Sequence, residues 1–269
     1  MSDLSAEAIG RALDRLGASV GRPLVVISET GSTNDDARAA ATKGAVHGAA
    51  FVADAQTKGR GRGGHSWHSP AGENVYLSMV ARPRIGAATI APITLAVGVA
   101  IARVMEARLD GRAPVWLKWP NDVLAGAAGD KRKLSGVLVE GQLRGSEVVS
   151  LVVGAGINVR AAAFPAELAA RATSLSLLGA AELDRSEIAA EILAGMGAAV
   201  ARFEEDRLAS FLPDLARLDA LRGALVEVAG VRGEAAGIDA EGRLLLRVEG
   251  GGITPVVTGE VRLLAEGRD

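Results

Sequence analysis

The segment at residues 59–64, Gly-Arg-Gly-Arg-Gly-Gly, constrains the fold of this chain more than any other stretch. Glycine lacks a Cβ atom, so its backbone reaches φ > 0 and its amide can approach an anion closely. A β-branched residue cannot follow such a path, and we therefore expect Gly61→Val to damage the loop. The two arginines supply guanidinium forks that match carboxylate or phosphate oxygens. The segment predicts a loop that holds two negatively charged groups close together.

The same segment satisfies G-x-G-x-x-G, which makes a dinucleotide-binding turn the first alternative. That turn needs a strand before it and a helix that opens directly after it. Residues 50–53 are apolar and predict the strand, but residues 65–72 are rich in turn formers and residues 74–80 alternate like a further strand. Arg84 stands about where such a turn requires an acidic residue. Dinucleotide binding is therefore excluded.

Composition limits the class of protein. The chain has 269 residues, of which 49% are hydrophobic and 23% charged, an ordinary globular balance. A net charge of −2 argues against a dedicated nucleic-acid binder. Cysteine is absent and the three histidines lack ligand spacing, so we assign no metal ligands. No signal peptide is visible, and the longest apolar stretch, residues 90–102, contains Pro92 and is too short to span a bilayer. We expect a soluble, cytoplasmic protein without a membrane partner.

Hydrophobic periodicity predicts mixed α and β structure. Helices are expected over residues 9–16, 33–43, 89–109 and 186–212, and strands over 24–27 (buried), 50–53, 74–80, 115–119, 134–142 and 148–157. Short strands parted by glycine-rich turns follow at 225–228, 235–238, 244–248, 253–257 and 261–264, which is typical of a small barrel. We place a domain boundary there, with domains at residues 1–218 and 219–269.

Four further clusters carry residues suited to chemistry: Ser-Thr-Asn at 32–34, Lys-Trp-Pro-Asn-Asp at 118–122, Lys-Arg-Lys-Leu-Ser-Gly at 131–136 and Gly-Ala-Gly-Ile-Asn at 154–158. Each has an ordinary structural explanation when taken singly: a helix N-cap, a turn after a strand, a solvated basic run and a strand bulge. Gly136 and the two strand glycines also leave room for a ligand close to the backbone.

In this order, the motifs S-T-N, Q-x-x-G-R-G-R-x-G-x-x-W, K-W-P-N-D, K-L-x-G and G-x-G-I-N resemble the catalytic domain of biotin protein ligases. The resemblance covers residues 25–158 by motif, and the C-terminal strands are similar to that family's small final domain. It implies an α+β fold in which helices flank a mixed central β-sheet, with a small SH3-like β-barrel after it. It also implies that biotin and ATP condense to biotinyl-5′-AMP with loss of pyrophosphate. The biotinyl group then passes to one lysine of the carrier domain of acetyl-CoA carboxylase or another biotin-dependent carboxylase.

The resemblance implies the following site. Catalytic roles fall to Lys133, Arg60 and Asp122: Arg60 holds the biotin carboxylate, Arg62 the phosphate, and Lys133 the reacting oxygens. Biotin contacts are Ser32, Thr33, Asn34, Gln56, Gly59, Arg60, Gly61, Arg62, Lys133, Gly136, Gly154 and Gly156. ATP and adenylate contacts are Arg60, Arg62, Trp67, Lys118, Asn121, Lys133 and Asn158. Asp122 either orients the acceptor lysine or helps to hold Mg²⁺ that arrives with the nucleotide. No contact is assigned to residues 161–173.

Partners and alternatives follow from the same comparison. The motif series begins at residue 32, which leaves no room for the winged DNA-binding domain of some relatives, so we expect a monofunctional ligase without a DNA partner. By analogy with relatives that dimerise through the central sheet, a homodimer through residues 148–153 is one option. A lipoate or octanoate ligase is the enzymatic alternative and would need a long apolar tunnel. An RNA-binding protein with an RGG-like segment is the non-enzymatic one, although such segments are normally long and repeated.

Overall fold

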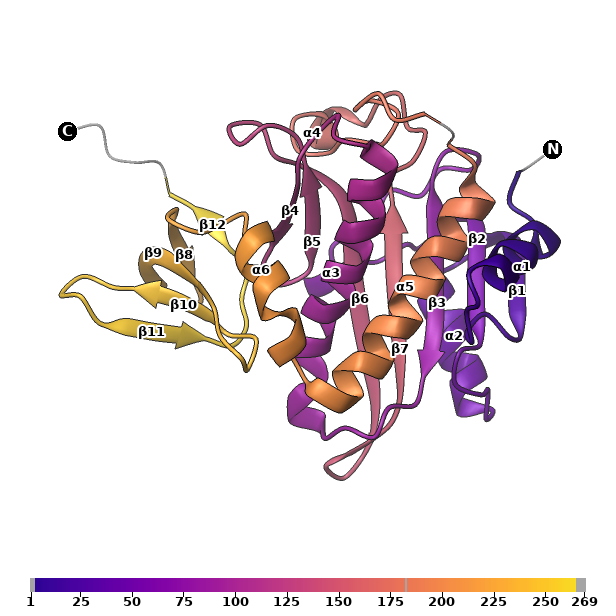
Figure 1. The fold of residues 1–269 in the computed structure, drawn as a ribbon, viewed down its shortest axis with the longest axis horizontal. Helices are drawn as coiled ribbons and strands as arrows, with labels where there is room; N and C mark the ends of the chain where they lie inside the picture. Colours follow the sequence, from indigo (N-terminus) through magenta and orange to yellow (C-terminus); the bar gives the residue numbers. More distant parts are fainter. Residues whose placement is uncertain (1–2, 182, 265–269) are drawn as a thin grey trace.

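A computed structural model of the chain describes residues 3–181 and 183–264 and contains a central seven-stranded sheet (Figure 1). Its strands are β1 (Leu24–Thr30), β2 (Ala50–Gln56), β3 (Val75–Ala81), β4 (Val115–Lys118), β5 (Asp122–Ala125), β6 (Arg132–Arg144) and β7 (Glu147–Ile157). They lie in the order β1-β2-β3-β7-β6-β5-β4. The β1–β2 pair is parallel and the other pairs are antiparallel. The predicted mixed sheet is confirmed.

The two faces of this sheet have different neighbours because side chains alternate along each strand. Met79 and Val153 belong to the large core with α3 (Ile90–Leu109) and α5 (Arg185–Asp206), and Figure 1 shows these two helices side by side in front of the sheet. α1 (Ala6–Arg15) packs against α5 on the same side. Val80 and Val152 instead join a small cluster with the alanines of α2 (Thr33–Thr42). α2 therefore covers the opposite face.

Helix α3 is apolar around most of its circumference because the sheet and α5 bury it from two sides. With the short 3₁₀ turn Ala87–Thr89 before it, the apolar segment Ala87–Leu109 has 23 residues and is long enough, by length and composition alone, to cross a membrane. The sequence-based estimate that this stretch is too short was therefore wrong about its length. A buried core helix has the same composition, and half of the segment's most apolar window is buried.

The C-terminal strands form a second sheet of five antiparallel strands in the order β11-β10-β9-β8-β12. Their bounds are β8 (Leu225–Val228), β9 (Val231–Ile238), β10 (Leu244–Arg247), β11 (Ile253–Val256) and β12 (Arg262–Leu263). The Trp119 side chain is 2% exposed and donates from Nε1 to Gly242 O at 2.9 Å, which fastens this sheet to the β4–β5 turn. The antiparallel C-terminal sheet is confirmed. Its description as an SH3-like barrel and the boundary at residue 219 stay predictions.

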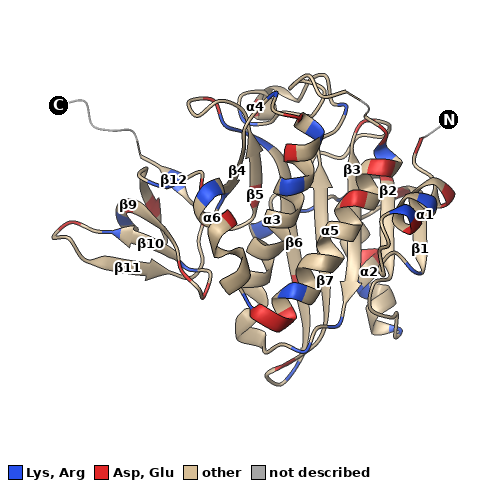
Figure 2. Ribbon diagram, viewed as in Figure 1, with Lys and Arg blue, Asp and Glu red and all other residues tan. Residues whose placement is uncertain are grey.

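Three local predictions were wrong. The strand predicted as buried is β1, an edge strand whose residues are intermediate or exposed. Asp122, predicted to lie in a turn, begins β5 (Asp122–Ala125), for which no strand was predicted, because Pro120 ends β4 and the chain folds back as a hairpin. The long helix ends at Asp206, where Arg207 adopts φ 56°, and α6 (Leu212–Leu218) starts separately. Figure 2 shows acidic and basic residues interspersed on the outer helices, in keeping with the small net charge.

We predict that Asp219→Asn stabilises the protein at neutral pH. Asp219 lies where the chain passes to the second sheet, is 7% exposed, and accepts from Leu221 N at 2.9 Å, while its Oδ2 has no hydrogen-bond partner among the described residues. Burial raises the pKa of this carboxyl. Because the folded-state pKa lies above the unfolded one, Asp219 costs stability as pH rises from the ordinary Asp range through the folded value. The gain at pH 7 should be about 1 kcal/mol and should vanish in acid.

The measurement is thermal unfolding of the wild type and Asp219→Asn between pH 4 and pH 8. Asp130→Asn, which removes an exposed carboxylate paired with Arg132, is the control and should show no such pH-dependent difference. A stability difference between wild type and Asp219→Asn that is equal at both ends of the pH range would contradict the prediction.

Candidate functional site

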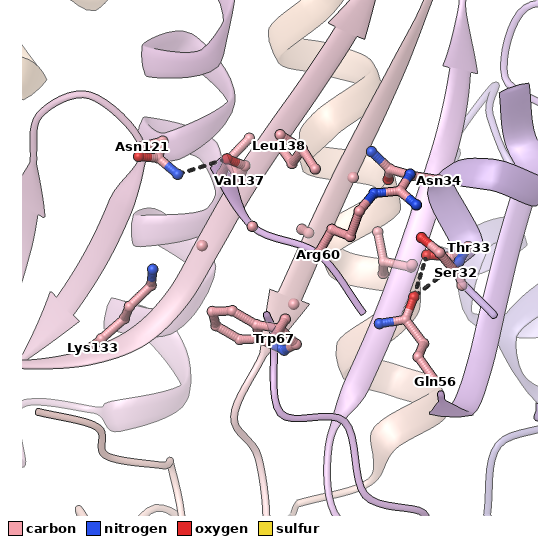
Figure 3. A pocket seen from close by; sticks show the side chains of 16 residues that line it. Ser32, Thr33, Asn34, Gln56, Arg60, Trp67, Asn121, Lys133, Val137 and Leu138 are labelled. Carbon is pink, nitrogen blue, oxygen red and sulfur yellow. Dashed lines mark hydrogen bonds between the residues drawn. The ribbon is translucent and has the colours of Figure 1, made fainter. Parts of the chain in front are cut away.

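A pocket of about 430 Å³, open solvent at its mouth included, lies beyond the N-terminal end of α2 on the α2 face of the sheet (Figure 3). The strands beneath it present glycines in adjacent register: Gly136 of β6 pairs with Gly156 of β7, and Leu138 pairs with Gly154. Its lining residues are Ser32, Thr33, Asn34, Gln56, Arg60, Gly61, Trp67, Leu77, Asn121, Lys133, Gly136, Val137, Leu138, Gly154, Ala155 and Gly156.

One end of the pocket is a network of hydroxyl and amide groups. Thr33 donates to Gln56 Oε1 from its backbone nitrogen at 2.9 Å and lies 3.2 Å from the same atom with its hydroxyl. Buried Ser78 of β3 donates to Asn34 Oδ1 at 2.6 Å and lies 2.8 Å from Thr33 Oγ1. Ser32 is the N-cap of α2, yet its hydroxyl makes no capping hydrogen bond. This end can therefore offer donors and acceptors to a neutral polar group.

The glycine floor is occupied by side chains in this structure. A Cβ atom at Gly154 would lie 1.9 Å from Asn34 Oδ1, and one at Gly156 would lie 2.4 Å from Trp67 Cε2. A Cβ at Gly136 would meet both Trp67 Cζ3 and Lys133 Cε at 3.1 Å. We expected these glycines to leave room for a ligand. In this structure the space above them is filled by three predicted site residues, Asn34, Trp67 and Lys133.

The opposite end of the pocket carries a positive charge. Lys133 Nζ forms an ion pair with Asp122 Oδ1 at 2.7 Å and lies 5.2 Å from the centre of the Trp67 ring. The indole Nε1 of Trp67 is buried and has no hydrogen-bond partner in residues 3–181 and 183–264. Nearby, Asn121 Nδ2 donates to Val137 O at 3.0 Å and holds the β4–β5 hairpin against β6. Figure 3 shows Lys133 across the pocket from Ser32, Thr33 and Gln56.

The 59–64 loop is closed by backbone hydrogen bonds from Gly61 N to His65 O at 2.7 Å and from Trp67 N to Gly59 O at 2.9 Å. Gly61 has φ −107°, which any residue adopts, and the positive values are at Gly63 (69°) and Gly64 (81°). The expectation that Gly61→Val would damage the loop through a positive φ was therefore wrong. The positive φ that favours glycine occurs two residues later, at Gly63, and again at Gly64.

Both loop arginines are engaged by the protein itself. Arg60 donates two hydrogen bonds to Asp35, from Nη1 to Oδ2 at 2.6 Å and from Nη2 to Oδ1 at 2.7 Å. Arg62 donates to Gly259 O at 2.9 Å and to Thr258 Oγ1, beside the second sheet. It lines a second cavity of about 920 Å³, which shares Asn121, Val137 and Leu138 with the first. In Figure 3 Arg60 points toward Asn34 and away from Lys133.

Residues 161–173 contact Lys133 through the backbone, an arrangement that the sequence left unassigned. Lys133 N donates to Arg171 O at 2.7 Å, and Thr173 N donates to Lys133 O at 2.9 Å. The Asn158 side chain joins the same two segments: its Nδ2 donates to Thr173 O at 2.9 Å and to Lys133 O at 3.3 Å. The segment therefore fixes the start of β6, from which the Lys133 side chain enters the pocket.

Most of the predicted site residues meet in the pocket. Gly59 takes part in closing the 59–64 loop, Asp122 contacts the lining residue Lys133, and Arg62, Lys118 and Asn158 lie outside the lining. Sequence reasoning missed Ser78, Asp35 and Glu140. Ser78 could have been found from strand alternation, because it stands across from Gly154 on β3. The sequence holds no such signal for Asp35 and Glu140, because their contacts form only in the folded chain.

We predict that Gly154→Ala destabilises the fold by about 1–3 kcal/mol. The new methyl group would collide with Asn34, which cannot give way because Ser78 and Glu140 hold its amide from two sides. Chemical denaturation measures the effect. Gly129→Ala is the matched control, since a methyl group there meets nothing within 4 Å. Equal midpoints for the two variants would contradict this account of the pocket floor.

Comparison with known proteins agrees with this geometry. Residues 30–158 match the biotin/lipoate A/B protein ligase family. The biotin--[acetyl-CoA-carboxylase] ligase of Mycobacterium tuberculosis is 36% identical over 258 residues, which cover 90% of each chain. The bifunctional ligase/repressor BirA of Escherichia coli is 34% identical over 220 residues, covering 80% of this chain and 66% of that protein.

A solved structure shows the same fold. The biotin protein ligase from Aquifex aeolicus, in complex with biotin and ATP, superposes with a TM-score of 0.75 at 28% identity. The match covers 89% of this chain and 97% of that one. Sequence similarity over nine-tenths of a relative, a shared fold and the assembled motifs lead to one conclusion: this chain belongs to the biotin/lipoate A/B protein ligase family.

Proposed function

We propose that this chain is an ATP-dependent biotin–protein ligase that activates biotin as biotinyl-5′-AMP and transfers it to a carrier lysine of acetyl-CoA carboxylase. The observation that carries the proposal is the polarity of the pocket. Its hydroxyl and amide end, at Thr33 and Gln56, suits a neutral ureido ring, and its Lys133 end suits a carboxylate. The names of two relatives support the same substrates, because they mention biotin, ATP and acetyl-CoA carboxylase.

In the first half-reaction, a biotin carboxylate oxygen attacks the α-phosphorus of ATP and pyrophosphate leaves. Two anionic groups must approach each other, so catalysis depends chiefly on positioning and charge neutralisation. Lys133 is the cation at the correct end of the pocket, and Asp122 keeps its ammonium group inside the site until the anions arrive. Arg62 lies beyond Asn121, where the second cavity adjoins the first, and is the candidate for a phosphate contact.

Ligand entry requires the Trp67 indole to move from its place above Gly136 and Gly156. An indole N–H that is buried without an acceptor is costly, and Trp67 Nε1 is in this condition. The present indole position is therefore one that a ligand can displace at low cost. Trp67 then remains beside the ligand as an aromatic wall, as proposed for the adenylate.

In the second half-reaction, the ε-amine of the acceptor lysine attacks the acyl carbon, and AMP leaves. The second cavity gives the acceptor a route, because it opens beside Asn121 on the same wall as the first pocket. Asp122 follows Asn121, which lines both cavities, and pairs with Lys133 of the first pocket. Its contact with Lys133 adds a third role to those considered above: orienting Lys133 itself.

Magnesium would enter with ATP and be held chiefly by the phosphates. Within the described residues no group of three or more His, Cys, Asp or Glu side chains is placed to hold a metal ion. Asp122, which pairs with Lys133, would be the protein carboxylate that assists the phosphates, and the metal would neutralise phosphate charge.

The alternatives fit the pocket less well. Lipoate and octanoate have no ureido group, so they would make no use of the donors and acceptors that Thr33 and Gln56 present at this end of the pocket. RGG-type RNA contacts come from long, repeated and disordered segments, whereas the single 59–64 segment is a folded loop closed by its own backbone hydrogen bonds.

Cellular location, DNA binding and oligomeric state stay predictions: a cytoplasmic protein without a DNA partner, with a homodimer as one option. Within the segment 148–153 named for the dimer, residues 151–153 of β7 are bonded to β3 and β6 on their two sides and offer no open edge. Gel filtration would detect a homodimer.

The direct test is exchange of labelled pyrophosphate into ATP with biotin, lipoate or octanoate as the acid. Exchange with biotin alone is expected. Exchange with lipoate or octanoate alone would reassign the pocket, and no exchange with any acid from folded protein would refute the adenylating function.

We predict that Lys133→Ala slows biotin-dependent exchange by about a hundred- to a thousand-fold, corresponding to about 2–4 kcal/mol of lost charge stabilisation. The fold should persist, because Lys133 is one-third exposed at a pocket edge. Arg132→Ala, which removes the neighbouring cation from its exposed pair with Asp130, is the matched control and should retain normal exchange. Equal rates for the two variants would remove Lys133 from the mechanism.

A further inference from the structure

Arg60 spans the mouth of the first pocket. The residue lines the pocket, yet its guanidinium ends on Asp35, in the first turn of α2 and outside the lining. Thr33 and Asn34, which precede Asp35, line the pocket themselves. The Arg60–Asp35 pair thus ties the loop above the pocket to the helix end that forms one of its walls.

The pair is part of a larger set of charges. Asp35 also accepts from Arg38 Nη1 at 2.6 Å, Arg38 pairs with Glu140 Oε1 at 2.5 Å, and Glu140 Oε2 accepts from Asn34 Nδ2 at 2.6 Å. The hydrogen bond from Arg60 is the main cause that lowers the pKa of Asp35, which shows that the pair favours the charged carboxylate. The charges of the two arginines and the two carboxylates cancel, so these ion pairs are complete without an anion from a ligand.

We infer that Asp35 is a positioning residue: by holding the Arg60 guanidinium with two hydrogen bonds, it keeps the 59–64 loop closed over the ligand. The inference rests on the proposed function for the identity of the ligand. It differs from the expectation that Arg60 holds the biotin carboxylate, because the guanidinium is committed to Asp35, on the side of the pocket away from Lys133. A bound acid would lie beneath the Arg60 side chain.

Two opposing factors set the strength of the Arg60–Asp35 pair. Both side chains are partly exposed, Arg60 by 35% and Asp35 by 44%, so water screens the pair and it can open. The double hydrogen bond makes it stronger than an ordinary surface pair. Its loss should therefore speed biotin dissociation by about five-fold, with little change in the maximal exchange rate at saturating biotin.

The experiment compares Asp35→Asn with Asp36→Asn in the full chain. Asp36 is the matched control: it stands in the same turn of α2, carries the same charge, and accepts from Thr30 Oγ1 at 2.7 Å instead of contacting the loop. Biotin dissociation is followed by tryptophan fluorescence. Amide hydrogen exchange over residues 59–67 is measured without ligand, where Gly61 N and Trp67 N report loop closure.

Asp35→Asn is expected to raise both the dissociation rate and the loop exchange, Asp36→Asn neither, and Asp35→Glu to restore most of the closure. The double variant Asp35→Asn with Arg60→Gln should be no worse than the poorer single variant, because the two residues act as one pair. Unchanged dissociation and loop exchange in Asp35→Asn would overturn the inference. Slower dissociation would also overturn it, since Asp35 would then compete with the ligand for Arg60.

The two proposals fail separately. If the wild type does not bind biotin, the proposed function fails, while the loop exchange in the ligand-free protein still tests the Asp35–Arg60 closure. If the wild type binds biotin and Asp35→Asn behaves like Asp36→Asn in both measurements, only the closure fails.

Discussion

The two-sidedness of strand β7 is the constraint on which the rest of this structure depends. Leu151, Val153 and Ile157 face the helices α3 and α5 and anchor the strand in the main core. The alternate positions, Gly154 and Gly156, carry no side chain on the opposite face. Because side chains alternate along a strand, β7 packs into the core with one face and presents only backbone to the pocket at these two glycines on the other. Since β7 is paired on both sides, this floor cannot shift without disturbing the whole sheet.

Around this floor, polar groups are held by one another as well as by the backbone. Ser78, Thr33 and Gln56 form a connected set at one end, and the Lys133–Asp122 pair stands at the other. Connected polar groups keep their orientation when a ligand arrives, which reduces the entropy lost on binding. The loop arginines extend this arrangement upward, since Arg60 reaches α2 and Arg62 reaches residues beside the second sheet. The loop is therefore bound at both sides of the pocket.

Much of the fold and site could be predicted from the sequence. Hydrophobic periodicity located most helices and strands, and the ordered motifs identified the residues that meet in the pocket. Hydrophobic periodicity could not locate β5, because residues 122–125 follow a proline turn and are too few to show a period. Nor could the sequence show that side chains fill the space above the floor glycines, because the residues that fill it, Asn34 and Trp67, are distant in the sequence. The pair between Arg60 and Asp35 of α2 could not be predicted either, because nothing in the local pattern reveals it.

The most direct measurement of this account is a crystal structure of the protein with biotin bound. We expect the ureido ring among Ser32, Thr33 and Gln56, the carboxylate within reach of Lys133, and the Trp67 indole displaced from Gly156. Biotin in the reverse orientation, with its carboxylate at Thr33, would contradict the assignment of the two ends of the pocket. Biotin bound elsewhere, with the glycine floor still covered by Trp67, would contradict the account of the site as a whole.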